Sequence, residues 1–461
     1  MIQPERVKIL NRKPIVNANR VVYWMQASQR VKLNHALEYA IEEANELSLP
    51  LTVVFGLTEA YPDANARHFA FMLQGLRDVR DLLHERGIGF VLKRMSPERA
   101  ALEASGDAAV LIMDRGYLRH QQNWCKTVAE HAPCQVVQVE SDVVVPVDLA
   151  SDKEEYAART IRPKIHRHLH HFLTPLRMTA VKHHSKEFSS EIDLDDIKGT
   201  LAKLYIDHSV GPVDWIKGGE TEADRALDVF IKQHLRFYAG KRSDPGRDYG
   251  SGLSPYLHFG HISPIKAALA AMETGNDENV QSFMEELVVR RELTFNFVTN
   301  NRSYDSYDSL PSWAVDTLKK HSKDARAYTY TREELEAAKT HDKYWNAAQR
   351  EMTATGRMHN YMRMYWAKKV IEWTEKPQAA FETLLTLNNK YFLDGRDPNS
   401  YGNVAWCFGK FDRPWGERDV FGTVRYMNEA GLRRKFDMDA YIERIDQITG
   451  TKSNSDPVLD L

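Results

Sequence analysis

Short apolar runs alternate with longer amphipathic segments over the first third of the chain. The runs have the length and the β-branched content of buried strands: VVYWM (21–25), LTVVFGL (51–57), GFVLKRM (89–95), AAVLIMD (108–114) and QVVQVE (135–140). The segments between them repeat apolar residues at helical spacing, and Ser96, Pro97 and Glu98 form a typical helix start. This alternation predicts a parallel five-stranded sheet covered on both faces, a Rossmann-like α/β domain over residues 1–150.

The pattern changes twice after residue 150. Residues 151–225 are polar and hold only short amphipathic pieces, which predicts a connector between two domains. His166 and His170 in this connector could share a zinc ion, but H-E-x-x-H and partnering cysteines are absent. A solvated polar face is therefore the favoured interpretation, and no metal is predicted. From 226 to 461 the apolar spacing is helical almost throughout, which predicts an all-α domain.

Composition and charge narrow the class of protein. The chain has 461 residues, too many for one ordinary core. Its 62 basic and 64 acidic residues give a net charge of −2, so only local clusters could bind nucleic acid. Three cysteines without C-x-x-C spacing, no secretory signal and no bilayer-length apolar run predict a cytoplasmic protein without a membrane partner.

Tryptophans and cations share one segment, GRMHNYMRMYWAKKVIEW (356–373), whose spacing predicts a single helix from its first glycine. Trp366 and Trp373 are two helical turns apart, which places both rings on one face about 10 Å apart along the axis. An electron relay would need this arrangement, but an ordinary hydrophobic stripe has the same spacing.

A turn-rich segment, YAGKRSDPGRDYGSGLSPYLHFGHIS (238–263), leads into another predicted helix. Gly250 and Gly252 leave backbone amides open, and Ser251 and Ser254 add hydroxyl groups. Amides and hydroxyls grouped before a helix suit a phosphate or pyrophosphate. Two further side chains of the segment could close over such a group: Tyr238 and Arg242. An ordinary capped loop is an equally good interpretation of this pattern alone.

Two segments near the C-terminus are dense in polar and aromatic residues. In LDGRDPNSYGNVAW (393–406) the polar residues need partners inside a helical domain, and Arg363 is a candidate partner for Asp394. A structural salt-bridge network would look the same. Residues 405–436 carry Trp406 and Trp415 among clustered cations, a surface that could bind phosphates and stack unpaired bases. For each tryptophan taken alone, burial in the core is the favoured interpretation.

Six ordered segments resemble the DNA photolyase/cryptochrome family, and within it the class II cyclobutane pyrimidine dimer photolyases. They are SGLSPYLHFGHIS (251–263), EELVVRREL (285–293), WNAAQREMTATG (345–356), TGRMHNYMRM (355–364), LDGRDPNSYGNVAW (393–406) and RPWGERDVFGTVRYM (413–427). The resemblance runs over nearly the whole chain, and its C-terminal motifs are the most specific.

The resemblance implies an antenna-type domain (1–150), an interdomain connector (151–225) and a helical catalytic domain that binds FAD and DNA (226–461). The implied activity is that of a deoxyribodipyrimidine photo-lyase. Excited reduced FAD donates an electron to a flipped-out pyrimidine dimer, the cyclobutane ring splits, and the electron returns. Damaged DNA is then the partner of a monomer, which would associate with the nucleoid in a bacterium. An antenna chromophore, a deazaflavin or a folate, is left open for the N-terminal domain.

Carried onto this sequence residue by residue, the resemblance implies the flavin site. Arg363 and Asp394 would form an ion pair beside the flavin ring, and Asn388 would face the flavin N5. The full set of implied FAD-binding residues is Tyr238, Gly250, Ser251, Gly252, Leu253, Ser254, His359, Arg363, Asn388, Asp394, Arg396 and Asp397.

The resemblance also implies the DNA contacts and the electron relay. Glu286 would hydrogen-bond the carbonyl edge of the dimer and stabilise its radical anion, so it joins Arg363, Asn388 and Asp394 as a catalytic residue. The implied DNA-binding residues are Arg242, Glu286, Arg290, Met364, Trp406, Trp415 and Arg425. The implied relay runs from the flavin through Trp366 and Trp345 to Trp373 near the surface.

Two departures from the wider family bear on the subclass. Many photolyases place a substrate-stacking tryptophan where this chain has Arg290, and the class I motif NGGWQW is replaced by GRDPNSYGNVAW. Both departures favour class II and leave the role of Arg290 open. The rival interpretations are a cryptochrome-like photoreceptor without repair activity and a nucleic-acid-binding protein with a vestigial flavin pocket.

Overall fold

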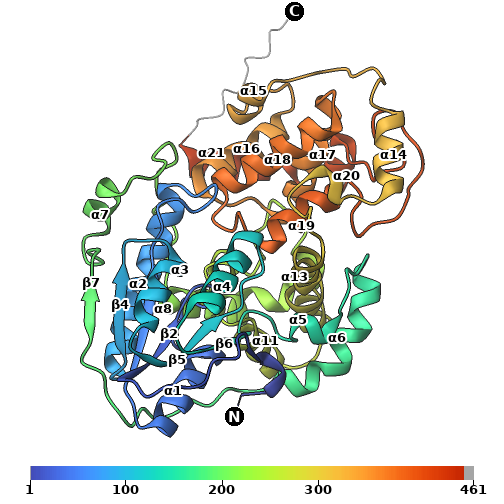
Figure 1. The fold of residues 1–461 in the computed structure, drawn as a ribbon. Coiled ribbons are helices and arrows are strands. Elements are labelled where there is room, and N and C mark those ends of the chain that lie inside the picture. Colours follow the sequence, from blue (N-terminus) through green and yellow to red (C-terminus); the bar gives the residue numbers. More distant parts are fainter. Residues whose placement is uncertain (1, 451–461) are drawn as a thin grey trace, which may run out of the picture.

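The computed structural model describes residues 2–450, and its N-terminal part is built around one sheet (Figure 1). The sheet has the strand order β1-β6-β5-β2-β3-β4-β7. Its five central strands are the predicted ones: β2 Arg20–Trp24, β3 Leu51–Gly56, β4 Gly89–Lys93, β5 Ala108–Asp114 and β6 Gln135–Val139. All five run parallel to their central neighbours.

The prediction of five strands is wrong, because two short edge strands make the total seven. β1 (Val7–Ile9) pairs antiparallel with β6, and β7 (Phe188–Ser190) pairs parallel with β4. Neither has a buried residue, so neither forms the apolar run by which the central strands were predicted. Their pairing depends on the backbone of the neighbouring strand rather than on their own side chains.

Helices cover both faces of the sheet, as the alternating pattern predicts. Along β2, Val21 and Tyr23 join one core cluster, while Val22 and Trp24 join another on the opposite face. The helices α1 (His35–Leu47) and α2 (Ala66–Glu85) supply the first cluster. The helices α3 (Pro97–Ser105) and α4 (Arg119–His131) supply the second, and α3 begins after Ser96 as predicted.

The predicted connector is largely structured. It holds α6 (Ala158–Phe172), the edge strand β7, α7 (Ile197–Lys203) and the start of α8 (Glu220–Val229), after a short α5 (Val147–Ala150). In Figure 1 its green segment passes along the outer edge of the sheet, where β7 lies beside β4. The boundaries at 150 and 225 stay predictions.

The described part of the chain from 230 to 450 holds mainly helices, as expected. Its elements are η2 (Phe230–His234), η3 (Leu235–Phe237), α9 (Tyr238–Lys241), α10 (Ser254–His258), α11 (Pro264–Glu273), α12 (Glu278–Met284), η4 (Glu285–Arg290), α13 (Arg291–Asn300), η5 (Tyr307–Ser309), α14 (Ser312–Lys320), α15 (Arg332–Glu336), α16 (Lys343–Thr355), α17 (Asn360–Trp373), α18 (Pro377–Tyr391), α19 (Pro398–Cys407), α20 (Glu429–Lys435) and α21 (Met438–Thr449). Residues 451–461, which the predicted helical domain includes, lie outside the described part.

The α/β part and the helical part are joined by buried polar contacts. Arg67 of α2 donates to the carbonyl oxygens of Met352 and Thr353 at the end of α16, and to that of Tyr391. Gly260 approaches the carbonyl oxygen of Ala27 so closely that a β-carbon would lie 1.8 Å from it. Ala27 follows the carboxyl end of β2, and Gly260 belongs to the helical part, so this end of β2 faces the helical domain. No helix in residues 2–450 is long and apolar enough to cross a bilayer.

Candidate functional site

The loop before α10 has an open backbone. Gly252 has a φ of +68°, and no heavy atom lies within 4 Å of the position that a β-carbon would take. Leu253 is buried below the loop, and Ser254 begins α10. Tyr238 is buried against Phe230 and Phe283, with the Arg242 guanidinium 5.5 Å from its ring centroid. The predicted phosphate loop thus leaves free space beside Gly252, and a phosphate group requires such space near the backbone.

The predicted pair Arg363 and Asp394 is present. Arg363 Nη2 donates to both carboxylate oxygens of Asp394, at 2.9 and 3.0 Å. The guanidinium also lies 3.8 Å from the centroid of the Phe392 ring, and its Nε donates to the carbonyl oxygen of Met358. These contacts hold a planar cation in one orientation on α17.

Asn388 and His359 lie on the elements that carry this pair. Asn388 is buried on α18, where its amide donates to the side chain of Asn389 at 3.1 Å. His359 caps the N-terminus of α17 by accepting from the backbone N–H of Tyr361. Burial lowers the pKa of His359 to about 4, so its imidazole is neutral at pH 7.

The start predicted for this helix is wrong. Gly356 has a φ of +71° and ends α16, and α17 begins only at Asn360. A left-handed glycine is a common helix end, so Gly356 closes the preceding helix instead of opening the next one. The turn between them is what places His359 as a cap.

Four predicted DNA contacts meet at a π-helical turn, η4, between α12 and α13. The N–H of Arg291 bonds to the carbonyl of Glu286, five residues earlier, which is the π pattern. Glu286 Oε1 accepts from Arg242 Nη2 at 2.8 Å and lies 3.2 Å from Arg290 Nε. The Arg290 guanidinium lies 5.3 Å from the Trp406 ring centroid. The sequence did not predict that these side chains form one group.

The other predicted DNA contacts lie further out on the helical domain. Trp415 is 43% exposed, and the guanidinium groups of Arg413 and Arg425 lie 5.7 and 5.2 Å from its ring centroid. The favoured interpretation of Trp415 as a core residue is therefore wrong, and Trp406 is only half-buried. Met364 is half-buried on α17, and its contact with bases stays a prediction.

The three tryptophans of the predicted relay are in ring contact. Trp366 and Trp345 are stacked with centroids 6.5 Å apart, and Trp345 meets Trp373 edge-on at 5.5 Å. Trp345 Nε1 donates to the carbonyl oxygen of Trp366, and Trp366 Nε1 donates to Gln349 Oε1. Trp373 is only 2% exposed, so it lies just beneath the surface, in ring contact with the half-buried Tyr330 and the exposed His341. The loop that precedes α16 covers it.

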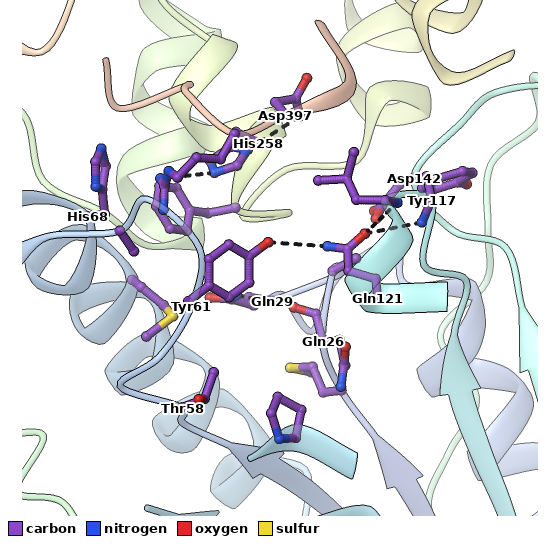
Figure 2. A pocket seen from close by; sticks show the side chains of 18 of the residues that line it. Gln26, Gln29, Thr58, Tyr61, His68, Tyr117, Gln121, Asp142, His258 and Asp397 are labelled. Carbon is purple, nitrogen blue, oxygen red and sulfur yellow. Dashed lines mark hydrogen bonds and ion pairs between the residues drawn. The ribbon is translucent and has the colours of Figure 1, made fainter. Parts of the chain in front are cut away.

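Arg396 and Asp397 line a cavity where the two parts of the protein meet (Figure 2). Asp397 caps α19 and pairs with His258 Nδ1 at 3.4 Å. Arg396 is buried with a φ of +63°, and its guanidinium lies 5.8 Å from the ring centroid of Tyr61. Their role in FAD binding stays a prediction.

The opposite wall of this cavity comes from residues that no sequence motif indicated. Figure 2 shows Tyr61 joined to Gln121 across the cavity, a hydrogen bond of 3.4 Å. Three buried polar atoms around it have no partner among the described residues: Gln26 Nε2, Gln29 Oε1 and Arg396 Nε. The signal that could have identified the site is topological. β2 lies between β5 and β3, and ligands of parallel sheets bind where the strand order reverses.

Comparisons of the sequence with known proteins all find members of one family. A family model described as DNA photolyase matches residues 21–182. The chain is 50% identical over 447 residues to a deoxyribodipyrimidine photo-lyase of Methanothermobacter thermautotrophicus, covering 96% of this chain and 99% of that one. It is 41% identical over 432 residues to the enzyme of the same name from Potorous tridactylus, covering 92% and 81%.

Solved structures show the same fold. A class III photolyase from Agrobacterium tumefaciens superposes with a TM-score of 0.72 at 19% identity, covering 94% of this chain and 87% of that one. A photolyase from Sulfolobus tokodaii, whose structure contains two FAD molecules, superposes with a TM-score of 0.68 at 16% identity. The match covers 95% of this chain and 95% of that one.

Proposed function

The chain belongs to the DNA photolyase family, and on that premise we propose that it uses light to split cyclobutane pyrimidine dimers in DNA. The observation that carries the proposal is the 50% identity to a deoxyribodipyrimidine photo-lyase over almost the entire length of both chains. The cryptochrome-like alternative has no such support. FAD is the cofactor, and damaged DNA is the partner.

The residues around α17 fit a bound FAD. The open loop at Gly252 and Ser254 would hold its phosphates, with Tyr238 packed beside them. The Arg363–Asp394 pair would lie beside the flavin ring, with Asn388 near by on α18. Bound in its reduced form, FAD supplies the electron that reaches the dimer after light absorption. The protein orients the ring and surrounds it with fixed charges.

The group on η4 supports a role in dimer binding. Two guanidiniums, those of Arg242 and Arg290, hold the Glu286 carboxylate in place before DNA arrives. The two guanidiniums also place fixed positive charge beside the negative charge that develops on the dimer. Trp406 offers an apolar ring on the other side of Arg290, where an everted base can pack. Trp415 would then stack on a base of the lesion strand, and Arg425 would attract its phosphate backbone.

The subclass and the assembly are finer proposals. The VRRE sequence at 289–292 and the absence of NGGWQW in the sequence support class II. We also propose that the enzyme acts as a monomer, near the nucleoid if the source is bacterial. The cavity lined by Tyr61, Gln121 and Arg396 would hold an antenna chromophore, so Arg396 would contact that chromophore instead of FAD, contrary to its predicted role. Its aromatic and unpartnered polar atoms fit a flat conjugated ring such as a deazaflavin or a folate.

The experiment that tests the function uses the full chain with reduced FAD and dimer-containing DNA, in blue light and in darkness. We expect thymines to reappear only in the light. The protein should also bind dimer-containing DNA more tightly than intact DNA at one fixed salt concentration. A protein that holds reduced FAD but restores no thymines under light would contradict the repair proposal, and leave a photoreceptor as the alternative.

Glu286→Ala is expected to lower the repair yield about tenfold or more, the scale on which a preorganised contact to developing charge contributes. The FAD content should stay near that of the unchanged protein, because Glu286 pairs with Arg242 and Arg290 rather than with the Arg363–Asp394 group. The measurement is thymine restored per photon absorbed, together with flavin absorbance per protein.

The matched control for this variant is Glu285→Ala on the same π-helical turn. Glu285 pairs with Arg162 of α6 at 2.7 Å, and its second and longer contact is with Arg290 Nε at 3.4 Å. Its loss should change stability slightly and leave the repair yield within about twofold, since partly exposed ion pairs contribute at most about 1 kcal/mol. Equal losses of repair in both variants would show that Glu286 acts only through the fold.

A further inference from the structure

The relay of tryptophans ends inside the protein. Trp373 is 2% exposed, so a reductant dissolved in water cannot reach the indole on which the relay was predicted to end. If electrons enter from solution, another group has to lie between Trp373 and the surface. This reasoning rests on the proposed function, because the relay serves FAD.

A second aromatic group continues from Trp373 to the surface. The Tyr330 ring meets Trp373 edge-on, with centroids 5.2 Å apart, and His341 meets the same indole at 5.3 Å. Tyr328 stacks on His341 at 3.6 Å and is 48% exposed. Tyr330 itself is half-buried, while His341 is exposed. Each step of this path is as short as the contacts between the tryptophans.

Hydrogen bonds orient the phenol of Tyr330. The backbone N–H of His341 donates to the Tyr330 oxygen at 3.0 Å, and the same oxygen lies 2.7 Å from Nδ1 of the His341 ring. The Tyr330 oxygen accepts from this backbone N–H, and its O–H can donate to Nδ1 when the imidazole carries its proton on Nε2. The His341 imidazole is therefore placed to accept the phenol proton of Tyr330.

We propose that Tyr330 is the terminal electron donor of the relay and that His341 takes its proton. The oxidant is light-excited oxidised FAD, which draws one electron through Trp366 and Trp345 and leaves the Trp373 indole as a radical cation. One electron then passes from Tyr330 to Trp373. The phenol O–H bond breaks as its proton moves to His341 Nδ1, giving a neutral tyrosyl radical and an imidazolium.

An external thiol completes the cycle. The thiol donates a hydrogen atom to the tyrosyl oxygen, the imidazolium releases its proton to water, and the resulting thiyl radicals pair as a disulfide. A phenol in its ordinary state is a far weaker acid than an imidazolium, so the proton stays on Tyr330 until the electron leaves. Loss of both together avoids a charged phenol radical and slows the return of the electron from Trp373 to Tyr330.

The contacts of Tyr330 distinguish it from the other tyrosines in the described part of the chain. Tyr365 is closer in sequence to Trp366 and donates its hydroxyl proton to Asp342, but it is buried. Among the tyrosines in residues 2–450, Tyr330 combines ring contact with Trp373, a base on its hydroxyl group and a path to water. That combination is what a terminal donor needs.

The test is transient absorption of the full chain carrying oxidised FAD, after a light flash, with and without thiol. In the unchanged protein we expect a tryptophan radical that decays into a tyrosyl radical, more slowly in deuterated water because a proton moves. Tyr330→Phe should abolish the tyrosyl signal, lengthen the life of the tryptophan radical and lower the yield of photoreduction severalfold. His341→Gln should slow the same decay, because the amide is no base.

Tyr328→Phe is the matched control, since Tyr328 stacks on the ring of His341 and does not occupy its Nδ1. It should keep the tyrosyl signal and the isotope effect. Repair by pre-reduced protein should be unchanged in all three variants, which also shows that they fold. A tryptophan radical that decays identically in Tyr330→Phe overturns this proposal alone. An unchanged protein that forms no tryptophan radical overturns the relay as well, and failed repair by pre-reduced protein would count against the proposed function.

Discussion

Trp366→Phe is expected to abolish the photoreduction of oxidised FAD while repair by pre-reduced protein stays largely intact. Trp366 stacks on Trp345 at 6.5 Å, and both indoles are buried. A phenyl ring keeps the apolar packing but is much harder to oxidise than an indole, so the first step of the relay is lost. The measurement follows flavin absorbance under blue light with thiol present, and in parallel the repair of dimer-containing DNA.

The control for this variant is Trp313→Phe, on α14 and outside the three-tryptophan relay. It should leave photoreduction unchanged, which separates the relay from a general effect of losing an indole. Unimpaired photoreduction in Trp366→Phe would remove this residue from the relay. Loss of repair by the pre-reduced variant would instead show that Trp366 supports the flavin site structurally.

Asp394→Ala is expected to reduce both stability and FAD retention. The change removes the carboxylate that pairs with the Arg363 guanidinium. The Arg363 side chain is 24% exposed and the Asp394 side chain 12% exposed, so the pair is largely shielded from water. Breaking a fully buried pair costs about 3–5 kcal/mol, and partial exposure lowers our expectation to about 2 kcal/mol. The measurements are the free energy of unfolding in denaturant and the flavin absorbance per purified protein.

Asp439→Ala offers the matched comparison. Asp439 pairs with Lys343 at 3.4 Å, and its side chain is 78% exposed. Its removal should cost no more than about 0.5 kcal/mol and leave the FAD content unchanged. If the two variants lose equal stability and Asp394→Ala retains its FAD, the Arg363–Asp394 pair has no special part in holding the cofactor.

Contacts that follow from local spacing were predictable from the sequence. The seven-residue spacing of Trp366 and Trp373 places both on one face of α17, and the structure shows both rings against Trp345. The five central strands were predictable because each is an apolar run of strand length. The pairing of Arg363 with Asp394 was also predicted, because a carboxylate in a helical core requires a partner.

Contacts between distant segments were not predictable in the same way. Arg290 stood out in the sequence only as a departure from a motif. Its place between Glu286 and Trp406 depends on how α19 packs against α13 and on the π-helical turn at η4. The extra residue in such a turn shifts which side chains face the site, and apolar spacing does not reveal it.

The linear order of residues determined the alternating α/β domain, the helical domain and the segments that carry the flavin chemistry, because period, length and local motif are properties of neighbours along the chain. The tertiary structure alone decided that Trp373 is buried and that Tyr330 and His341 lie between it and water. It also decided that Arg396 meets Tyr61 at a cavity between the two parts. The burial of a side chain, and a contact between residues more than three hundred positions apart such as Tyr61 and Arg396, depend on how whole helices and strands pack. No local sequence pattern encodes that packing.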